Sequence, residues 1–452
     1  MTQAESVRAS ARPPGPRIGP LAAVRAFRED PIGLLERAAE AGDISYFRAG
    51  PFRVYALSHP DLVRELLVLR HREVKKGRGL QALKYLLGEG LLTSEGDFHR
   101  SQRRTIQPIF HHMRIEGYAG SMVELAERAA NRWEEGRTVD VHREMYGLTL
   151  AIVGRTLFDT DIEADDAREV SEALATGLQL FDRLMSVFAP VLSLLPLPAT
   201  RRLNHALARL DRVIYGMIEE RRRSGTDGDD LLSMLLRARD EEGGGREMTD
   251  RQVRDEAMTI FLAGHETTSV AMTWTWYLLS EHPEVEQRLH SELDGVLGER
   301  PPTIDDLPRL PYTERVLTES MRLYPPAWVL GRTALEDVDL GGYRVPAGSA
   351  LVASQWVMHR DGRWFDDPLS FRPERWTDEF RVSLPRNAYF PFGAGPRVCI
   401  GEPFAWMEGA LLLATLARRW RLRLVPGHPI GFAPQVTLRP AHGMRMTLEL
   451  RV

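Results

Sequence analysis

The stretch FPFGAGPRVCIG (residues 390–401) contains Cys399, the single cysteine in a chain of 452 residues. Three glycines surround it and allow backbone angles that other residues rarely adopt. Pro403 suits the first turn of a helix, and FAWMEGALLLATLARRW (residues 404–420) has the spacing of a buried helix. Cys399 is therefore predicted just before a helix N-terminus, where free N–H groups and the helix dipole stabilise a thiolate.

A lone thiol in this position leaves few roles open. It cannot form an internal disulfide, and it excludes zinc and iron–sulfur sites that need several cysteines. A structural cysteine would favour an inert apolar position, so the glycine-rich loop favours a nucleophile or a metal ligand. A nucleophile needs a base, usually histidine, and none of the 13 histidines lies in a recognisable cysteine-hydrolase signature. A single thiolate can instead bind a heme iron as its axial ligand.

The composition excludes several classes of partner. Hydrophobic residues make up 43% of the chain and charged residues 27%, so a substantial core can form. The net charge of -4 gives no general reason to bind nucleic acid. Residues 1–20 contain no apolar signal region, and no stretch reaches about 18 uninterrupted apolar residues. We therefore expect no nucleic-acid partner, no membrane anchor and a cytoplasmic location.

Strand patterns occur near both ends of the chain. Residues 43–50 and 52–58 alternate like two strands around a turn. The segment LGGYRVPAGSALVAS (residues 340–354) predicts a hairpin, whereas VTLRP (residues 436–440) and MRMTLELRV (residues 444–452) predict terminal strands.

Between these strand patterns, residues 60 to about 297 are mostly helical in pattern, with flexible breaks at 224–230 and 241–247. The fold class expected is therefore mainly α with a smaller β region. No linker is long enough to demand separate domains. We expect one domain over residues 1–452, in which residues 1–20 form an irregular Pro-rich lead-in.

Two predicted helices carry unusual residues. The first begins with a capping box of Thr249 and Gln252 and runs to about Glu281, roughly 32 residues or about 48 Å. Its centre, FLAGHETTS (residues 261–269), contains a glycine and two threonines, which are poor helix formers, and such a weakness in a core helix often marks a functional site. The second helix, in YTERVLTESMRLYPP (residues 312–326), places two opposite charges three residues apart on one face.

Residues 392–401, which follow the pattern F-G-x-G-x-R-x-C-x-G, resemble the heme-binding loop of the cytochrome P450 family. Four further motifs occur in the order found in that family: HRSQRR (residues 99–104), GHETT (264–268), ESMR (319–322) and FRPERW (371–376). The resemblance covers about residues 12–452. It implies a cytochrome P450-like fold with heme between the long central helix and the helix that follows the cysteine loop.

The resemblance also implies a role for each motif. Cys399 would be the iron ligand, and Glu266 and Thr267 would be the acid–alcohol pair that relays protons. Glu319, Arg322 and Arg375 would form a structural triad. The residues expected to contact heme b are His99, Arg103, Arg332, Phe392, Arg397, Cys399 and Gly264. His99 stands where the family often has tryptophan.

The chemistry of these residue types agrees with those roles. A thiolate donates electron density to the iron and favours cleavage of the O–O bond. That cleavage also needs protons, which a hydroxyl and a carboxylate on the opposite face can supply. Arginine suits pairing with the two heme propionates. Gly264 or Ala263 would leave room for dioxygen.

Several patterns have competing interpretations. His265 and Glu266 do not complete H-E-x-x-H, because residue 269 is serine, and the HRD at 359–361 lacks the other kinase motifs. A basic run is either a solvated face or a docking site for an acidic ferredoxin: Arg418, Arg419, Arg421 and Arg423. The candidates for a substrate pocket suit a protein core equally well: Phe181, Met185, Phe261, Leu262, Ala263, Trp328, Val329 and Leu330.

These patterns together predict a heme-dependent monooxygenase that inserts one oxygen atom from O2 into a hydrophobic small molecule. The wording of the motifs favours a terpenoid over a fatty acid. Because no flavin or nicotinamide site is recognisable, we expect electrons from an external ferredoxin or flavodoxin with its reductase. Two alternatives stay open: a peroxide-driven peroxygenase with the same cysteine and heme, and a non-catalytic heme-binding sensor.

Overall fold

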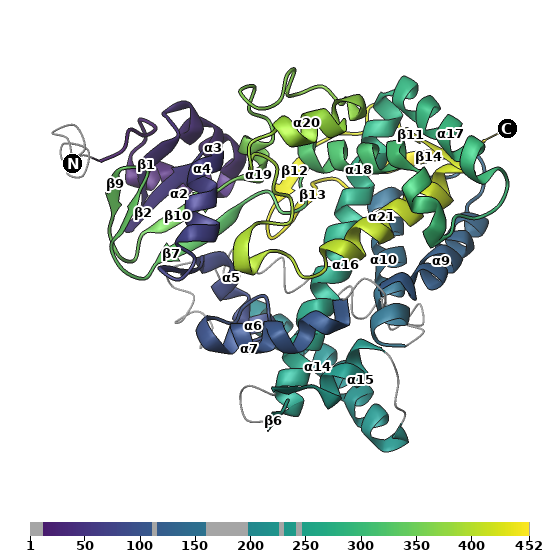
Figure 1. The fold of residues 1–452 in the computed structure, drawn as a ribbon, viewed down its shortest axis with the longest axis horizontal. Helices are drawn as coiled ribbons and strands as arrows, with labels where there is room; N and C mark the ends of the chain where they lie inside the picture. Colours follow the sequence, from purple (N-terminus) through teal and green to yellow (C-terminus); the bar gives the residue numbers. More distant parts are fainter. Residues whose placement is uncertain (1–11, 111–114, 160–197, 226–229, 241–245, 452) are drawn as a thin grey trace. The chain divides into compact units, whose positions relative to one another are not determined.

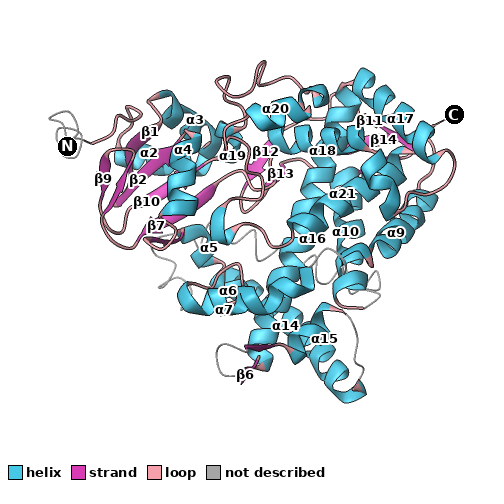
Figure 2. Ribbon diagram, in the orientation of Figure 1, coloured by secondary structure: helices cyan, strands magenta, loops and turns pink. Residues whose placement is uncertain are grey.

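The computed structural model describes residues 12–110, 115–159, 198–225, 230–240 and 246–451. The chain packs as two compact units (Figures 1 and 2). The first unit consists of Met1–Gln81 with Thr318–Cys399, and the second of Ala82–Leu317 with Ile400–Val452. Within the described part of the chain, no helix is both long and apolar enough to cross a bilayer.

The first unit is built on a five-stranded sheet in the order β1-β2-β10-β7-β3, shown in magenta in Figure 2. β1 (Ile44–Ala49) and β2 (Phe52–Leu57) form the predicted antiparallel pair, and Gly50 has a positive φ at the turn. Leu62 and Leu66 pack with Leu351 and other sheet residues in one apolar core.

The remaining elements of the first unit are short. They are α2 (Pro20–Glu29), α3 (Pro31–Glu40), α4 (Pro60–Arg64), η1 (Glu65–Leu69), β3 (Val74–Lys76), β7 (Leu330–Ala334), β8 (Val338–Leu340), β9 (Tyr343–Val345), β10 (Ala350–Ala353), α19 (Gln355–Met358), η4 (Pro373–Arg375), α20 (Asp378–Ser383) and η5 (Gly395–Arg397). Two helices span the boundaries between the units, namely α5 (Arg78–Ala82) and α18 (Pro311–Leu323).

The second unit is organised around α16 (Asp250–Glu281), which packs against α10 (Val141–Leu157) and α21 (Glu402–Ala417) (Figure 1). The predicted capping box is present, with the backbone N–H of Thr249 donating to Gln252 Oε1 at 2.8 Å and the backbone N–H of Gln252 donating to Thr249 Oγ1 at 3.3 Å. The helix bounds match the sequence prediction because caps and proline act locally.

The other elements of the second unit are helices and small sheets. The helices are α6 (Lys84–Leu87), α7 (Gly96–Ile106), η2 (Gln107–Phe110), α9 (Ala119–Arg132), α14 (Pro198–Ser224), α15 (Leu231–Arg237), α17 (Pro283–Leu297) and η3 (Ile304–Arg309). The strands are β4 (Thr138–Asp140), β5 (Arg239–Asp240), β6 (Arg246–Glu247), β11 (Trp420–Leu424), β12 (Phe432–Pro434), β13 (Leu438–Pro440) and β14 (Arg445–Leu450).

The two predicted terminal strands are confirmed as β13 and β14, but the hairpin predicted over residues 340–354 is wrong in its second half. The hairpin there joins β8 to β9 around Gly341 and Gly342. β10 instead pairs in parallel with β2 and antiparallel with β7. Its alternation of apolar residues fits either pairing, and only the long-range sheet decides between them.

Candidate active site

The cysteine loop is held in shape by its own backbone. Gly393 and Gly395 have φ values of 77° and 71°. A Cβ on Gly395 would lie 2.2 Å from the carbonyl oxygen of Leu67, so a larger residue could not fit. The backbone N–H of Cys399 donates to the carbonyl of Phe392 at 2.9 Å, and the Cys399 residue is exposed. The loop therefore presents the thiol instead of burying it.

His359 fixes the start of the same loop. Its Nε2 accepts a hydrogen bond from the backbone N–H of Phe390 at 3.0 Å. Burial lowers the pKa of His359 well below its ordinary value, and the positive charges of Arg322 and Arg360 lower it further. The neutral imidazole keeps Nε2 available as an acceptor.

The predicted triad residues lie in contact beneath this histidine. Glu319 receives Arg322 Nε at 2.8 Å on Oε2 and Arg375 Nε at 2.9 Å on Oε1. Trp376 Nε1 donates to Glu319 Oε2 at 2.8 Å. Arg322 also donates to the carbonyl of His359 at 2.8 Å. Because every charge here is buried and paired, removing one partner would leave another uncompensated.

The centre of α16 is open on one face. Ala263 is exposed, and Gly264 and Thr267 are half-buried, although most residues of this helix are buried. Thr267 shares a face with Ala263 and with Gly264, because helix positions three and four apart project in similar directions. Thr267 Oγ1 donates to the carbonyl of Ala263 at 2.8 Å. On its other side Gly264 lies close to α10, since a Cβ would be 3.0 Å from Val153 Cγ2.

Glu266 is buried on a different side of α16 from that open face. Its carboxylate accepts two hydrogen bonds from Arg439, each 2.5 Å long, and a third from Thr437 Oγ1 at 2.7 Å. Burial alone would raise the pKa of Glu266, but the charge and hydrogen bonds of Arg439 outweigh it and lower the pKa. Glu266 is therefore an ionised carboxylate bound to the β12–β13 hairpin.

His265 is neutral and packed in the core. Burial lowers the pKa of its imidazole to about 4. Its ring lies edge-on to Tyr146 at 4.7 Å and to Phe261 at 5.6 Å between ring centres. This environment agrees with the interpretation of His265 as a structural helix residue and not a metal ligand.

The residues predicted to bind the propionates come from three elements. His99 and Arg103 are one helical turn apart on α7, and His99 is buried. Arg332 on β7 is buried and donates to the carbonyl of Gly331 at 2.9 Å. Arg397 lies in η5, directly before the cysteine segment, and is half-buried.

The candidate pocket residues divide by exposure. Phe181 and Met185 lie outside the described residues. Phe261, Leu262 and Trp328 are buried, as core residues would be. Ala263 is exposed, whereas Val329 and Leu330 are half-buried. Ala263, Val329 and Leu330 are thus the candidates that retain accessible surface.

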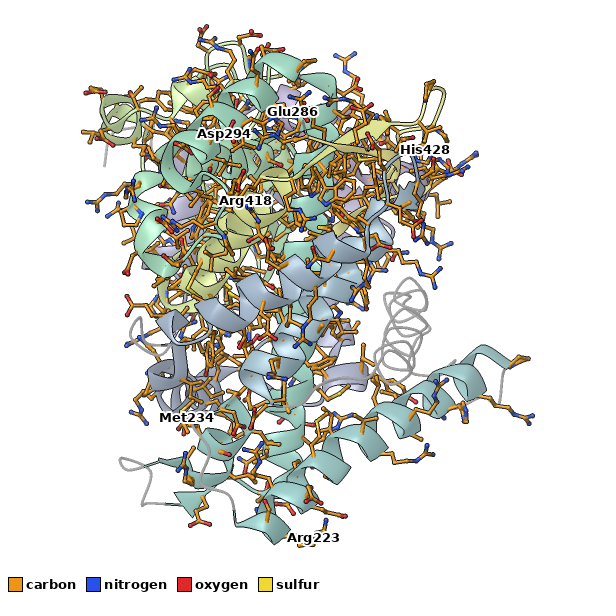
Figure 3. The ribbon with its side chains drawn as sticks, turned by 90° about the vertical axis from the view of Figure 1, so that its right-hand side faces the viewer. Arg223, Met234, Glu286, Asp294, Arg418 and His428 are labelled. Atoms are coloured by element: carbon orange, nitrogen blue, oxygen red, sulfur yellow. The ribbon has the colours of Figure 1, made fainter. Side chains whose placement is uncertain are left out.

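The basic run near the C-terminus is half-buried and partly solvated. Arg423 forms a two-pronged ion pair with Glu286 of α17, at 2.7 and 3.0 Å. Arg418 is largely buried and donates to Glu127 of α9 at 3.0 Å. Arg418 and Glu286 are labelled in Figure 3. These arginines therefore hold their own unit together, and docking of an acidic ferredoxin at this run stays a prediction.

The residues present fit a heme group. Free cysteine is among the most buried residue types, so an exposed cysteine on a glycine-shaped loop suits an iron ligand. The open face at the centre of α16 carries only small groups and one hydroxyl, as needed beside a flat ring with room for dioxygen. Both features are local to their own units.

A model of the family described as Cytochrome P450 matches residues 11–443. The chain belongs to the cytochrome P450 family. The chain is 42% identical over 423 residues to cyclooctatin synthase of Streptomyces melanosporofaciens, covering 93% of this chain and 92% of that protein. It is also 42% identical over 400 residues to cyclooctat-9-en-7-ol 5-monooxygenase of the same organism, covering 88% and 86%.

A third relative is pentalenene oxygenase of Streptomyces avermitilis, which is 37% identical over 422 residues and covered to 93% on both sides. Among solved structures, the heme domain of cytochrome P450DA matches with a TM-score of 0.86 and 28% identity, over 98% of this chain and 99% of that one. The protein is therefore a P450 monooxygenase with heme as its cofactor. The predicted family, fold class and cofactor are confirmed.

Sequence reasoning missed several residues that hold the site. Arg439 and Thr437 lie about 170 positions after Glu266 and carry no local signal for it. Glu408 lies inside a predicted apolar helix, and a lone acid in such a run is itself a signal. His359 belongs to the HRD triplet, and no local pattern links it to the cysteine loop 31 positions later.

Proposed function

We propose that residues 1–452 form one heme-thiolate monooxygenase domain that inserts an oxygen atom from O2 into a cyclic terpenoid. The observation that carries this proposal is the likeness to relatives named for cyclooctatin, cyclooctat-9-en-7-ol and pentalenene, each over 86% or more of both proteins. The small apolar Ala263 on the open face of α16 suits such a substrate, which offers little for polar side chains to bind.

Cys399 is the proposed iron ligand. Glycine geometry and His359 fix the shape of its loop, and Cys399 would hold the heme iron through its thiolate. α21 begins at Glu402, three residues later, with proline in its first turn. The start of a helix favours the thiolate over the thiol. When bound, the heme iron would activate dioxygen and transfer one oxygen atom to the substrate.

Thr267 and Glu266 are proposed to manage protons. Thr267 holds a proton at Oγ1, which at rest is donated to the carbonyl of Ala263. A rotation about its side-chain bond would aim the same proton at the open face of α16. Glu266 is ionised and held by Arg439, so it accepts a proton only when that ion pair loosens. Proton delivery is thus tied to the β12–β13 hairpin.

Cationic side chains are proposed to bind the heme propionates. Arg103, Arg332 and Arg397 would each pair with a carboxylate, with His99 as an additional hydrogen-bonding group. Electrons would come from an external ferredoxin or flavodoxin with its reductase.

The test is turnover of purified holoenzyme with ferredoxin and its reductase, using pentalenene and lauric acid as probes under isotopically labelled dioxygen. We expect a pentalenene product with one labelled oxygen atom and little product from lauric acid. Preference for lauric acid would overturn the terpenoid assignment. Product formation with hydrogen peroxide but not with reduced ferredoxin would favour the peroxygenase alternative.

A further inference from the structure

The loop between α6 and α7, residues 88–95, is attached to α16 by two adjacent acidic side chains. The backbone N–H of Glu89 donates to Asp255 Oδ2 at 2.9 Å. The backbone N–H of Leu91 donates to Glu256 Oε2, also at 2.9 Å. Asp255 and Glu256 are buried, and the proposed mechanism uses neither. Alternate N–H groups of one loop therefore bind neighbouring carboxylates of one helix.

The loop approaches α16 more closely than larger residues would allow. A Cβ on Gly88 would lie 2.1 Å from Asp255 Oδ1, and a Cβ on Gly90 would lie 2.2 Å from Thr259 Oγ1. Gly88 also has a φ of 69°, which glycine adopts readily. Glycine therefore stands on either side of Glu89, the residue whose N–H Asp255 holds.

The same loop is also attached to α7. The carbonyl of Glu89 accepts a hydrogen bond from Gln102 Nε2 at 3.0 Å, and Gln102 is buried. Glu89 is thus held twice through its backbone, by α16 at its N–H and by α7 at its carbonyl. Gln102 lies next to Arg103 and three positions after His99, the α7 residues proposed to meet the heme propionates.

Hydrogen bonds within the loop fix its shape up to the start of α7. Thr93 Oγ1 donates to the carbonyl of Gly88 at 2.7 Å. The backbone N–H groups of Thr93 and Ser94 donate to the carbonyl of Gly90 at 3.0 and 2.9 Å. Because α7 begins at Gly96, two residues later, a shift of the loop on α16 would also shift α7.

We propose that Asp255 and Glu256 are positioning residues of the heme site, which hold α7 at a fixed position relative to α16 through this loop. Glu256 lies about two helical turns before Ala263. The loop thereby connects the helix proposed to bind the propionates with the helix proposed to meet oxygen. The effect on heme rests on the proposed role of His99 and Arg103, whereas the attachment of the loop does not.

The first experiment measures amide hydrogen exchange of the loop in full-length holoenzyme without substrate. Glu256→Met removes the acceptor of the Leu91 N–H, and exchange there should become about tenfold faster, the value of one hydrogen bond. Asp255→Leu should do the same at Glu89. Glu256→Gln keeps an acceptor oxygen and should exchange like the wild type. Unchanged exchange at Leu91 in Glu256→Met would overturn the proposal, whatever the heme measurements show.

The second experiment is the rate at which the holoenzyme loses heme to excess apomyoglobin. We expect about tenfold faster loss in Glu256→Met and a rate close to that of the wild type in Glu256→Gln. Gln102→Met breaks the attachment to α7 instead and should also lose heme faster, so the test holds even if Glu256→Met fails to fold. A wild-type rate in Gln102→Met would refute the proposal.

The matched control is Glu292→Met. Glu292 of α17 also accepts two backbone N–H groups of the same unit, from Tyr312 at 2.6 Å and from Thr313 at 2.8 Å. Its loss should destabilise the protein without accelerating heme loss. Heme loss as fast in Glu292→Met as in Glu256→Met would reflect general destabilisation and would contradict a positioning role.

Arg103→Met separates this proposal from the proposed propionate contacts. If Glu256 acts through α7, the double variant Arg103→Met with Glu256→Met should lose heme more slowly than the product of the two single effects predicts. Fully multiplicative effects would mean that Glu256 acts by another route, against the proposal. If Arg103→Met alone keeps the wild-type rate while Glu256→Met and Gln102→Met accelerate loss, only the propionate role of Arg103 is wrong.

Discussion

Glu266 and Glu408 are two buried glutamates of the same unit in opposite states. Glu266 accepts three hydrogen bonds from Arg439 and Thr437, and its pKa is lowered. Glu408 is buried at least as deeply, but among the described residues its carboxyl oxygens have no hydrogen-bond partner, and burial raises its pKa to about 8. Burial pushes both pKa values upward, so the partner decides which state results.

The comparison separates three uses of one residue type. Glu319, another buried glutamate, is shared between Arg322 and Arg375 and holds the backbone beneath the cysteine loop. Glu266 is ionised and held by Arg439 of β13, which suits the proposed proton transfer. Glu408 has no hydrogen-bond partner among the described residues, and its raised pKa favours the protonated form at neutral pH. A sequence motif can identify such a glutamate, but the groups around its carboxyl decide whether it is ionised.

Removing the cation that pairs with Glu266 should have the largest effect on stability. Arg439→Met leaves a buried carboxylate without its cation and should lower the free energy of unfolding by about 3 kcal/mol at neutral pH. Because the pKa of Glu266 is lowered in the native state, the pair stabilises above the unfolded pKa near 4.5, and that contribution is lost as the pH falls. Denaturant unfolding across this pH range measures the deficit.

The control for that prediction is the double variant Arg439→Met with Glu266→Gln, which replaces both charges. It should recover most of the lost stability, since no buried charge then lacks a partner. Equal deficits in the single and double variants would contradict an ion pair between these residues.

The contribution of Glu408 to the free energy of unfolding should change with pH in the direction opposite to that of Glu266. Its raised pKa means that the native state holds a proton which the unfolded chain releases above about pH 4.5. The contribution of Glu408 to the free energy of unfolding therefore falls as the pH rises to about 8, by up to about 1.4 kcal/mol per pH unit. Because glutamine does not titrate, the stability of Glu408→Gln relative to the wild type should increase over the same pH range. A constant difference in unfolding free energy would contradict the raised pKa.

Thr267 is proposed to deliver a proton at the open face of α16. Thr267→Ala should lower product formed per electron consumed by at least about tenfold, because a positioned proton donor is lost. The measurement is the ratio of terpenoid product to reductant consumed. Unchanged coupling in Thr267→Ala would remove Thr267 from the proton relay.

The smallest expected effect serves as a baseline for both glutamates. Thr249→Ala removes the capping box of α16 and should cost about 1 kcal/mol of unfolding free energy. Thr249 contacts neither carboxylate, so the loss should not change between about pH 5 and about pH 8. A pH-dependent loss would show that the unfolding signal does not isolate Glu266 and Glu408.

Local patterns predicted what depends on local chemistry. The capping box, the bounds of α16 and the glycine-shaped cysteine loop all followed from residues a few positions apart. The partners of Glu266 and the strand neighbours of β10 could not be predicted, because they join segments far apart in the chain. No alternation or spacing specifies which distant arginine meets a given carboxylate.

The role of Cys399 as the iron ligand is tested most directly by the absorption spectrum of the reduced, CO-bound protein. We predict a strongly red-shifted Soret band in the wild type, as thiolate ligation produces, and its loss in Cys399→Ser. A band typical of histidine ligation, or a red-shifted band that persists in Cys399→Ser, would contradict the account.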